Sequence, residues 1–317
     1  MKTAKRILVS ILTVCMLLSL AACGGGKAPD AQNAPAADAV QEASDAITVT
    51  DMSGRTVTLQ GNAEKVVALT AADCEILFAL GAGDMLIGRG EYCDWPEEAL
   101  SAPAVQSGAE TNIEQIIALK PDVVLMSMME QTPEQVDMLE KSGIHCVQSY
   151  AQNIEGVYTA IDLIGAVTGK TDEAVALIDS MKSAFAACGE NAAENEGKTV
   201  YFEVSPLEYG LWTSGAGTFM DEMAQMLGMT NIFADVDGWA EVSEEQVIER
   251  NPDYIVTISM YFGEGPTPVE EIMGREGWQG ITAIKNGAVL NADSNEISRP
   301  GPRLADAVKT LDAFFAD

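Results

Sequence analysis

Hydrophobic and polar positions follow two different periods along this chain. The stretch from Ile47 to Leu59, ITVTDMSGRTVTL, alternates residue by residue on both sides of Ser53-Gly54, which predicts a β-hairpin. From Lys65 onward, short apolar runs alternate with segments whose apolar positions recur at helical spacing. The expected strands cover residues 65–69, 85–88, 145–148, 199–204 and 288–291. The expected helices cover residues 72–80, 133–142, 154–168, 171–188, 218–227, 269–274 and a terminal segment from about 303. This order predicts an α/β fold with mainly parallel sheets covered by helices.

A helix–strand segment occurs twice, 131 positions apart. Asn112–Ser127 reads NIEQIIALKPDVVLMS, and Ser243–Ile258 reads SEEQVIERNPDYIVTI. The matching pairs in register are Glu114/Glu245, Gln115/Gln246, Ile117/Ile248, Pro121/Pro252 and Asp122/Asp253. Each copy opens on an N-cap residue with a Gln at capping-box spacing and a Glu in the first turn, where the helix dipole favours an anion. Each Pro-Asp pair predicts the end of the helix and the start of a buried strand. The duplication indicates two lobes.

Two helical stretches lie between the lobes, at about 154–168 and 171–188. The second is expected to begin at Thr171 as its N-cap and to bury one stripe of side chains: Ala174, Val175, Ile178, Met181, Phe185 and Cys188. Its length predicts a rod of about 27 Å. We therefore expect an N-terminal lobe over 47–170, a bridging helix and linker over 171–195, and a C-terminal lobe over 196–317. One helical crossing should permit only small rocking of the lobes.

The first 22 residues have the character of a signal peptide, with a basic start and an apolar run, Ile7–Leu20, that is shorter than the roughly 20 residues a spanning helix needs. The residues that follow, Leu20-Ala21-Ala22-Cys23, resemble a bacterial lipobox, which implies cleavage before Cys23 and a lipid anchor on it. The alternative is ordinary secretion with Cys23 left free. Residues 23–46 are rich in Gly, Ala, Pro, Gln and Asp and predict a disordered tether.

Net charge and cysteine content limit which partners, disulfides and metals we expect. The net charge is −30, and removal of the three basic residues of the signal segment brings the mature chain to about −33. Such a chain is repelled by nucleic acid and by anionic lipid, so we expect no nucleic-acid partner. Four widely spaced cysteines, Cys74, Cys93, Cys146 and Cys188, are expected to be buried free thiols, with a disulfide as the alternative. The single histidine, His145, lies in an apolar strand, and we expect neither a resident metal nor a cofactor.

Several stretches are similar, in order, to one family: ITVTDMSGRTVTL, KVVALTAADCEILFALGAGDMLIG, EYCDWPEEA, NIEQIIALKPDVVL, GWAEVSEEQVIERNPDYIV and RPGPRLADAVKTL. They resemble the Fe/B12 periplasmic-binding family, the class III substrate-binding proteins of ABC importers for ferric siderophores, haem and vitamin B12. The resemblance runs from about Ile47 to the C-terminus, with the family's own domain at about 65–317. It implies two α/β lobes bridged by one long helix, a monomer lipid-anchored at the outer face of the cell membrane, and delivery of a chelate to a permease and its ATPase subunits. It also implies that Glu114 and Glu245 dock on the permease.

Ligands of open α/β sheets bind beyond the carboxyl ends of the strands. The loops expected there carry a dense set of aromatic and Met residues: Tyr92, Trp95, Met128, Met129, Tyr209, Trp212, Trp239, Tyr261 and Phe262. Such a set suits a large flat ligand held by apolar contact. From it we select Tyr92, Trp95, Met128, Trp212, Trp239 and Tyr261, with Arg299, as candidate ligand contacts.

The resemblance and the charges rank the ligands. Tyr92, Trp212 and Trp239 fall where B12-binding members carry cleft aromatics, whereas Ser127 stands where some carry a Trp. Arginine is scarce in these loops, which argues against highly anionic ferric catecholates and for a corrinoid or a ferric hydroxamate. Haem, with Tyr92 or Met128 as axial ligand, is a further alternative. No dinucleotide fingerprint, P-loop or nucleophile elbow occurs, so we expect no enzyme; an extracytoplasmic hydrolase with paired carboxylates is the alternative from a different class.

Overall fold

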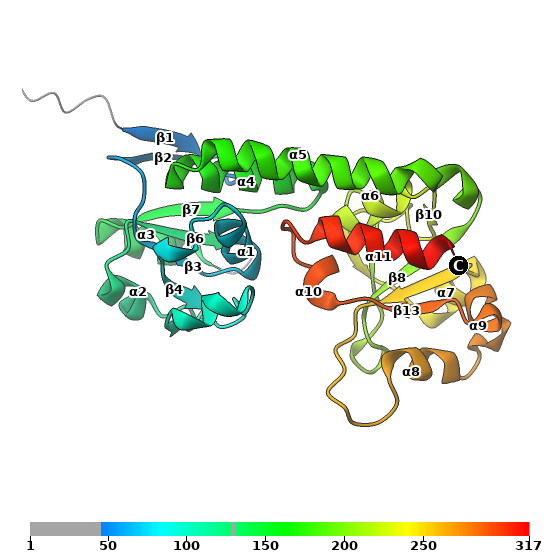
Figure 1. Ribbon diagram of the computed structural model, residues 1–317. Coiled ribbons are helices and arrows are strands. Elements are labelled where there is room, and N and C mark those ends of the chain that lie inside the picture. Colours follow the sequence, from blue (N-terminus) through cyan, green and yellow to red (C-terminus); the bar gives the residue numbers. More distant parts are fainter. Residues whose placement is uncertain (1–45, 128–130, 317) are drawn as a thin grey trace, which may run out of the picture. The chain divides into compact units, whose positions relative to one another are not determined.

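The computed structural model describes residues 46–127 and 131–316 of the chain. These residues form two α/β lobes, each built on its own sheet, which agrees with the alternating pattern of the sequence (Figure 1). The expected signal segment, Cys23, the tether up to residue 45 and Met128 lie outside this part of the chain. Within it, no helix combines the length and the apolar character needed to cross a bilayer.

The N-terminal lobe opens with the expected hairpin, in which β1 (Ile47–Thr50) pairs antiparallel with β2 (Thr56–Leu59). The sheet that follows is five-stranded and parallel throughout, with the order β5-β4-β3-β6-β7. Its strands are β3 (Val66–Ala68), β4 (Leu86–Gly90), β5 (Ala104–Val105), β6 (Val123–Ser127) and β7 (His145–Ser149). Its helices are α1 (Ala71–Ala79), α2 (Ile113–Leu119) and α3 (Pro133–Lys141).

Both faces of this sheet are buried, as a parallel sheet requires. Val123 and Leu125 of β6 belong to the same apolar cluster as side chains of α1, α4 (Ile154–Thr168) and α5 (Thr171–Cys188). Val124 and Met126, which alternate with them, belong to a second cluster with side chains of α2 and α3. The strand therefore reads as an unbroken apolar run because each successive side chain enters a different core.

The C-terminal lobe contains a mixed sheet with the order β11-β9-β8-β12-β13, and β10 also pairs with β8. Its parallel strands are β8 (Thr199–Ser205), β10 (Thr230–Asn231), β12 (Tyr254–Thr257) and β13 (Val289–Asn291). Its antiparallel strands are β9 (Trp212–Ser214) and β11 (Trp239–Glu241). Its helices are α6 (Phe219–Met226), α7 (Glu244–Arg250), α8 (Pro268–Gly274), α9 (Thr282–Asn286), α10 (Ser294–Ile297) and α11 (Leu304–Ala316).

The placement of Trp212 and Trp239 in loops was wrong, because both lie on antiparallel strands at the β11 end of this sheet. Glu203 of β8 pairs with Thr213 of β9, and Trp239 of β11 pairs with Ser214. Each of these antiparallel strands has only three residues, which is too short for a period of two to stand out in the sequence. Short 3-10 helices complete the fold at Gly83–Met85, Glu97–Ser101, Gly189–Asn195, Leu207–Tyr209 and Trp278–Gly280.

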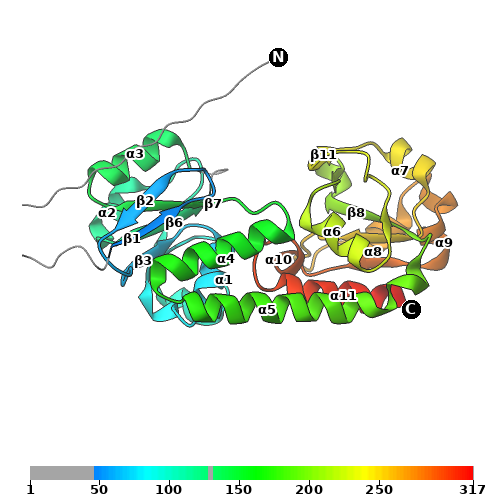
Figure 2. The same cartoon turned by 90° about the horizontal axis from the view of Figure 1, so that it is seen from above.

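Helices α4 (Ile154–Thr168) and α5 (Thr171–Cys188) lie side by side, and α11 also packs on α5 (Figure 2). The buried stripe of α5 holds Ala174, Ile178, Met181, Phe185 and Cys188. The prediction was wrong for Val175, which is exposed because it lies about 100° around the helix from Ala174. It was also wrong for the cap: the N-cap is Lys170, without a side-chain cap bond, and Thr171 is already helical.

The two copies of the repeated unit form α2 with β6 and α7 with β12. In the second copy Ser243 Oγ accepts from Gln246 N at 3.3 Å and Gln246 Oε1 accepts from Ser243 N at 2.9 Å, so the capping box is complete. In the first copy Asn112 Oδ1 accepts from Gln115 N at 3.1 Å, but among the described residues Asn112 N does not donate to the Gln115 side chain. The capping-box prediction was therefore wrong here: Asn112 N donates to the carbonyl of Gln106, and the Gln115 side chain accepts from Gln106 N.

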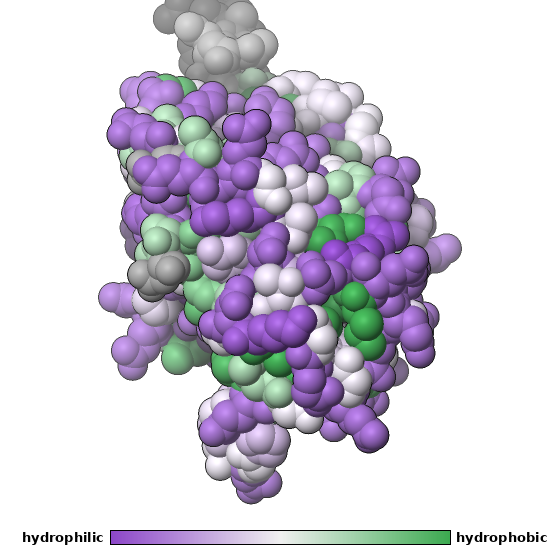
Figure 3. Space-filling view, turned by 90° about the vertical axis from the view of Figure 1, so that its right-hand side faces the viewer, coloured by the Kyte–Doolittle hydropathy of each residue, from purple (hydrophilic) through white to green (hydrophobic). Residues whose placement is uncertain are grey.

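Hydrophilic residues cover most of the face shown in Figure 3, and hydrophobic residues form small separate patches on it. A strongly acidic chain is expected to present such a solvated surface. Exposed large apolar side chains gather in the loops beyond the strands, which are described next.

Candidate functional site

A cavity of about 890 Å³ lies at the carboxyl ends of the strands. The segment after β8, Pro206–Tyr209, and the segment after β12, Ile258–Phe262, form much of its lining. The segment after β13 contributes Ser294, Ser298 and Arg299, and Tyr92, which follows β4, contributes from the N-terminal lobe. This is the edge at which open α/β sheets bind ligands, because the loops after neighbouring parallel strands converge there.

Large apolar side chains in this lining are turned to solvent. Tyr92 is 77% exposed, Tyr209 is 76% exposed and Phe262 is 86% exposed, with Met260 and Tyr261 also exposed beside them. Rings with this exposure are not part of the core, and clustered apolar exposure marks a binding surface more often than a packing accident. The Tyr261 hydroxyl donates to the carbonyl of Gly265 at 3.3 Å, so this ring is held within its own loop.

Among the described residues that line the cavity, the charged side chains are three glutamates, Glu208, Glu264 and Glu271, and one arginine, Arg299. Arg299 Nη1 donates to Glu75 Oε1 at 2.9 Å and to Asp94 Oδ1 at 2.8 Å. The guanidinium therefore reaches the cavity wall already bonded to two carboxylates of the N-terminal lobe.

Of the candidate contacts, Tyr92, Tyr261 and Arg299 come together in this cavity. Trp95, three positions after Tyr92, is not among the lining residues and is half exposed. The Cζ atom of Arg303 lies 4.9 Å from the centre of its ring. Met128 falls outside the described residues.

The two remaining tryptophans take different positions. Trp212 is exposed on β9, whereas Trp239 is half-buried on β11 and packs on Phe219 with the ring centroids 5.6 Å apart. Both lie on the paired antiparallel strands of the C-terminal sheet, and the cavity lining does not include them. Part of the Trp239 surface is therefore committed to the core of this lobe.

Sequence reasoning left several members of the site out of the selected set. Tyr209 and Phe262 were visible as loop aromatics, and their flanking Pro206 and Gly263 mark the same loops. Glu75 carried no signal: it lies in α1, 224 positions before Arg299, and only the fold brings them together. Long-range ion pairs of this kind leave no periodic pattern in a single sequence.

Glu114 and Glu245, the expected docking residues, are both exposed in the first turns of α2 and α7. Bonding to its own backbone N–H and to the Ser243 hydroxyl lowers the pKa of Glu245, so this carboxylate is ionised at neutral pH. The two side chains occupy equivalent places in the two copies of the repeated unit.

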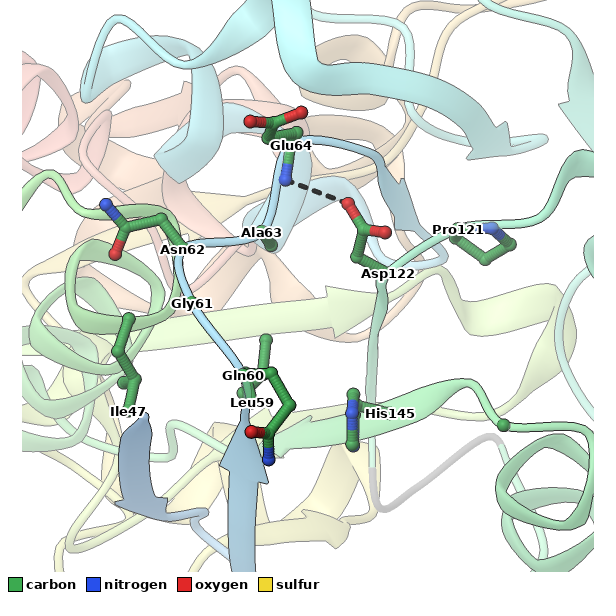
Figure 4. A pocket seen from close by; sticks show the side chains of 11 residues that line it. Ile47, Leu59, Gln60, Gly61, Asn62, Ala63, Glu64, Pro121, Asp122 and His145 are labelled. Carbon is green, nitrogen blue, oxygen red and sulfur yellow. Dashed lines mark hydrogen bonds between the residues drawn. The ribbon is translucent and has the colours of Figure 1, made fainter. Parts of the chain in front are cut away.

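A second cavity, of about 860 Å³, lies at the opposite edge of the N-terminal sheet (Figure 4). Its lining includes Leu59, Asp122 and His145, which lie at the end of β2 and at the starts of β6 and β7. Figure 4 shows Asp122 accepting a backbone hydrogen bond from Glu64, a bond that orders the chain entering β3. The strands begin here rather than end, so this cavity lies away from the expected ligand edge.

Metal-binding chemistry within the protein itself is not apparent in the part of the chain described. Among these residues, no group of three or more His, Cys, Asp and Glu side chains has an arrangement that could hold an ion. Cys74, Cys93, Cys146 and Cys188 are buried free thiols. Burial raises the pKa of Cys146 to about 12, which keeps this thiol protonated and unreactive at neutral pH.

Two α/β lobes and an aromatic cavity at the strand ends define a two-lobed ligand-binding protein. Residues 66–296 match the family described as periplasmic binding protein, and the chain belongs to that family. The fold and the resemblance expected from the sequence are thereby confirmed, as is the expectation that the chain is a solute-binding protein rather than an enzyme.

Three relatives illustrate the similarity. The uncharacterized ABC transporter substrate-binding lipoprotein YvrC of Bacillus subtilis (strain 168) is 34% identical over 84% of each chain. A cobalamin-binding protein of Halobacterium salinarum (strain ATCC 29341 / DSM 671 / R1) is 27% identical over 96% of this chain and 84% of its own length. The crystal structure of a possible iron-binding, periplasmic solute-binding protein from Staphylococcus epidermidis ATCC 12228 superposes with a TM-score of 0.69 at 28% identity, covering 81% of this chain and 100% of its own.

Proposed function

We propose that this chain captures an iron or cobalt chelate outside the cytoplasm and delivers it to the permease of an ABC importer. The observation that carries the proposal is the cavity of about 890 Å³, walled by exposed rings at the carboxyl ends of the strands. Its volume lies near the upper end of small-molecule sites, which suits a ligand larger than a sugar or an amino acid. The rings supply apolar contact that holds a large flat ligand without specific charge.

A corrinoid ranks first among the chelates. The cavity offers aromatic contact and one arginine that is already paired, and a neutral ligand needs no counter-charge. The similarity to a cobalamin-binding protein supports this order. Besides Tyr92, Tyr261 and Arg299, we propose four further contacts. Trp95 and Met128 are proposed from their places in the loops expected beyond the strands, and Trp212 and Trp239 also from the family resemblance.

A ferric siderophore ranks second. The structural similarity to a possible iron-binding protein supports it, and a ferric hydroxamate would tolerate the acidic wall. Haem ranks third, because the exposed phenol of Tyr92 offers an axial oxygen ligand.

Delivery requires contact with the importer. We propose that Glu114 and Glu245 meet basic side chains of the permease, one from each lobe, because both are exposed first-turn carboxylates at equivalent positions. The lipobox sequence ending in Cys23 supports attachment to the outer face of the membrane through lipid, and the family resemblance supports a monomer. This arrangement keeps the receptor beside its permease and ATPase partners.

The test of the site is truncation of one ring. Tyr92→Ala should weaken cyanocobalamin binding at least tenfold, because removal of an aromatic anchor commonly costs about 2 kcal/mol, or roughly thirtyfold in affinity. Met138→Ala, which removes an exposed apolar side chain from α3, is the matched control and should leave the affinity unchanged. Isothermal titration calorimetry measures both. Equal affinities of the wild type and Tyr92→Ala for a bound chelate would contradict the proposed site.

A further inference from the structure

Arg299 is the one basic side chain among the described residues that line the cavity. An arginine facing a ligand site usually indicates recognition of an anionic group, because its guanidinium forms paired hydrogen bonds with carboxylate, phosphate or catecholate oxygens. The three glutamates of the same wall oppose that use. Whether the cavity attracts or repels an anion therefore depends on whether Arg299 is already paired with a carboxylate.

Arg299 belongs to a group of four charged side chains that spans the two lobes. Glu75 is buried at 3% exposure and accepts from Arg299 at 2.9 Å and from Arg303 at 2.7 and 2.9 Å. Because the Arg303 guanidinium bonds both oxygens of Glu75, that carboxylate is already matched by a full positive charge. The charge of Arg299 is then matched by Asp94, whose Oδ1 lies 2.8 Å from Nη1.

The two carboxylates differ in how easily a ligand could replace them. The side chain of Glu75 is 2% exposed, whereas that of Asp94 is 53% exposed. Asp94 is therefore the removable partner, and an anionic ligand reaching Arg299 would have to compete with it. Partial burial acts to raise the pKa of Asp94, but the hydrogen bond and charge of Arg299 lower it overall. The carboxylate is thus ionised at neutral pH, and protonation would release it only in strongly acidic solution.

We propose that Asp94 determines ligand specificity by masking Arg299, so that the receptor disfavours anionic chelates and accepts neutral or cationic ones. This inference rests on the proposed function, because it concerns the same cavity. With Arg299 neutralised, the remaining charges of the wall are those of Glu208, Glu264 and Glu271. Glu271 is bonded to Arg275, but Arg275 is also bonded to the buried Glu203, so these three side chains together keep one negative charge. An anion entering the cavity therefore meets like charge. Removal of Asp94 restores one unmatched positive charge at the wall.

The test compares chelates of different charge on the intact mature protein. The probes are a trianionic ferric tris-catecholate, a cationic ferric trihydroxamate and neutral cyanocobalamin, titrated into the wild type, Asp94→Asn and the control Asp137→Asn. Asp137 is exposed on α3 and pairs with Lys141, so this control removes the same charge far from the site in sequence. Asp94→Ser is a second variant in case the Asn amide keeps the bond to Arg299.

Wild-type protein should bind the tris-catecholate at least tenfold more weakly than its preferred neutral or cationic probe. Asp94→Asn or Asp94→Ser should raise the ratio of anionic to neutral affinity at least tenfold, and Asp137→Asn should leave that ratio unchanged. The gain should shrink with added salt and disappear when Arg299→Gln is combined with the Asp94 change, since it requires the unmasked guanidinium.

Three results would overturn the proposal. One is an unchanged affinity ratio in both Asp94 variants, with thermal melts showing folded protein. Another is a wild type that binds the tris-catecholate as tightly as the neutral and cationic probes; in both cases the chelate-receptor function stands. The third is saturable binding of none of the probes by any variant, which removes the proposed function and the masking role together.

Discussion

The two copies of the repeated helix–strand unit share a frame and differ in their surroundings. In each copy the aspartate after the proline accepts from the backbone at the start of the neighbouring strand. Asp122 Oδ2 accepts from Glu64 N and Lys65 N, at 2.9 Å each. Asp253 Oδ2 accepts from both the backbone N–H and the hydroxyl of Thr199, also at 2.9 Å each.

The difference between the copies lies in burial and in what the surrounding side chains do. Asp122 is exposed and Asp253 is half-buried. Each helix ends on a non-glycine residue in the left-handed region, Lys120 with φ of 53° or Asn251 with φ of 44°. The side-chain oxygen of Asn251 accepts from Thr282, whereas the structure shows no side-chain hydrogen bond for Lys120 among the described residues. The two copies therefore share their backbone arrangement. Because their neighbours differ, we expect equivalent residues to contribute differently to the stability of the fold.

The largest effect is expected at the exposed first-turn glutamate that both copies carry, and it is an effect on transport. Changing Glu114 and Glu245 to Arg together should abolish uptake of the imported chelate, because both proposed contacts with basic permease residues become repulsive. Ligand affinity of the purified protein should stay within a few-fold. Transport assays in cells and titration of the purified variant measure the two quantities.

The double variant Glu134→Arg with Glu249→Arg is the control for this experiment. It makes the same charge change at exposed positions on α3 and α7 and should leave transport intact. If ligand affinity collapses in the Glu114/Glu245 variant, the two carboxylates serve the binding cavity and their assignment to docking fails.

A smaller effect, on the free energy of unfolding, is expected to differ between the two aspartates. Asp253→Ala should lower the free energy of unfolding by about 2 kcal/mol, because a half-buried carboxylate with two donors is lost and the Thr199 groups lose their acceptor. Asp122→Ala should cost about 1 kcal/mol, because its exposed donors are resolvated by water. Urea denaturation of both variants checks the order. Equal losses, or a larger loss at Asp122, would show that burial does not set the difference.

The smallest expected effect concerns the left-handed residue that ends each helix, and it should differ between the two copies. Lys120→Gly should raise the stability by about 0.5 kcal/mol, since glycine adopts the left-handed region without the strain of a side chain and loses part of that gain through its flexible unfolded state. Asn251→Gly relieves the same strain but removes the acceptor for Thr282, so it should be neutral or destabilising. Thermal melts of the pair decide the point; stabilisation of both variants by the same amount would mean that the Thr282 bond contributes nothing.

Local patterns predicted most of the fold, because a parallel strand buried on both faces is a continuous apolar run and an amphipathic helix has apolar positions at helical spacing. The hairpin, the strands at Val66–Ala68 and Val123–Ser127 and the long helix at Thr171–Cys188 follow from local patterns. The three-residue antiparallel strands β9 and β11 do not, because pairing with neighbouring strands, rather than their own composition, forms them.

The candidate site divides in the same way. Tyr92 and Tyr261 could be chosen because an aromatic ring in a loop after a strand is unusual enough to mark a cavity. The neutralisation of Arg299 could not be foreseen, because its partners Glu75 and Asp94 lie 224 and 205 positions earlier in the chain. Sequence alone therefore presented Arg299 as an available cation, and the fold shows it bonded to two carboxylates.

The central claim, that the aromatic cavity receives a metal chelate, is tested most directly by titration of tryptophan fluorescence. Trp95 and Trp212 are exposed, so a coloured chelate bound in or near the cavity should quench them. Cyanocobalamin, a ferric hydroxamate, a ferric catecholate and haemin are titrated in parallel against the mature protein. The account predicts saturable quenching by cyanocobalamin at micromolar concentration or below, with the ferric catecholate weakest. Tight binding of a ferric siderophore alone would displace the corrinoid from first place, and saturable binding of none of the four would contradict the account.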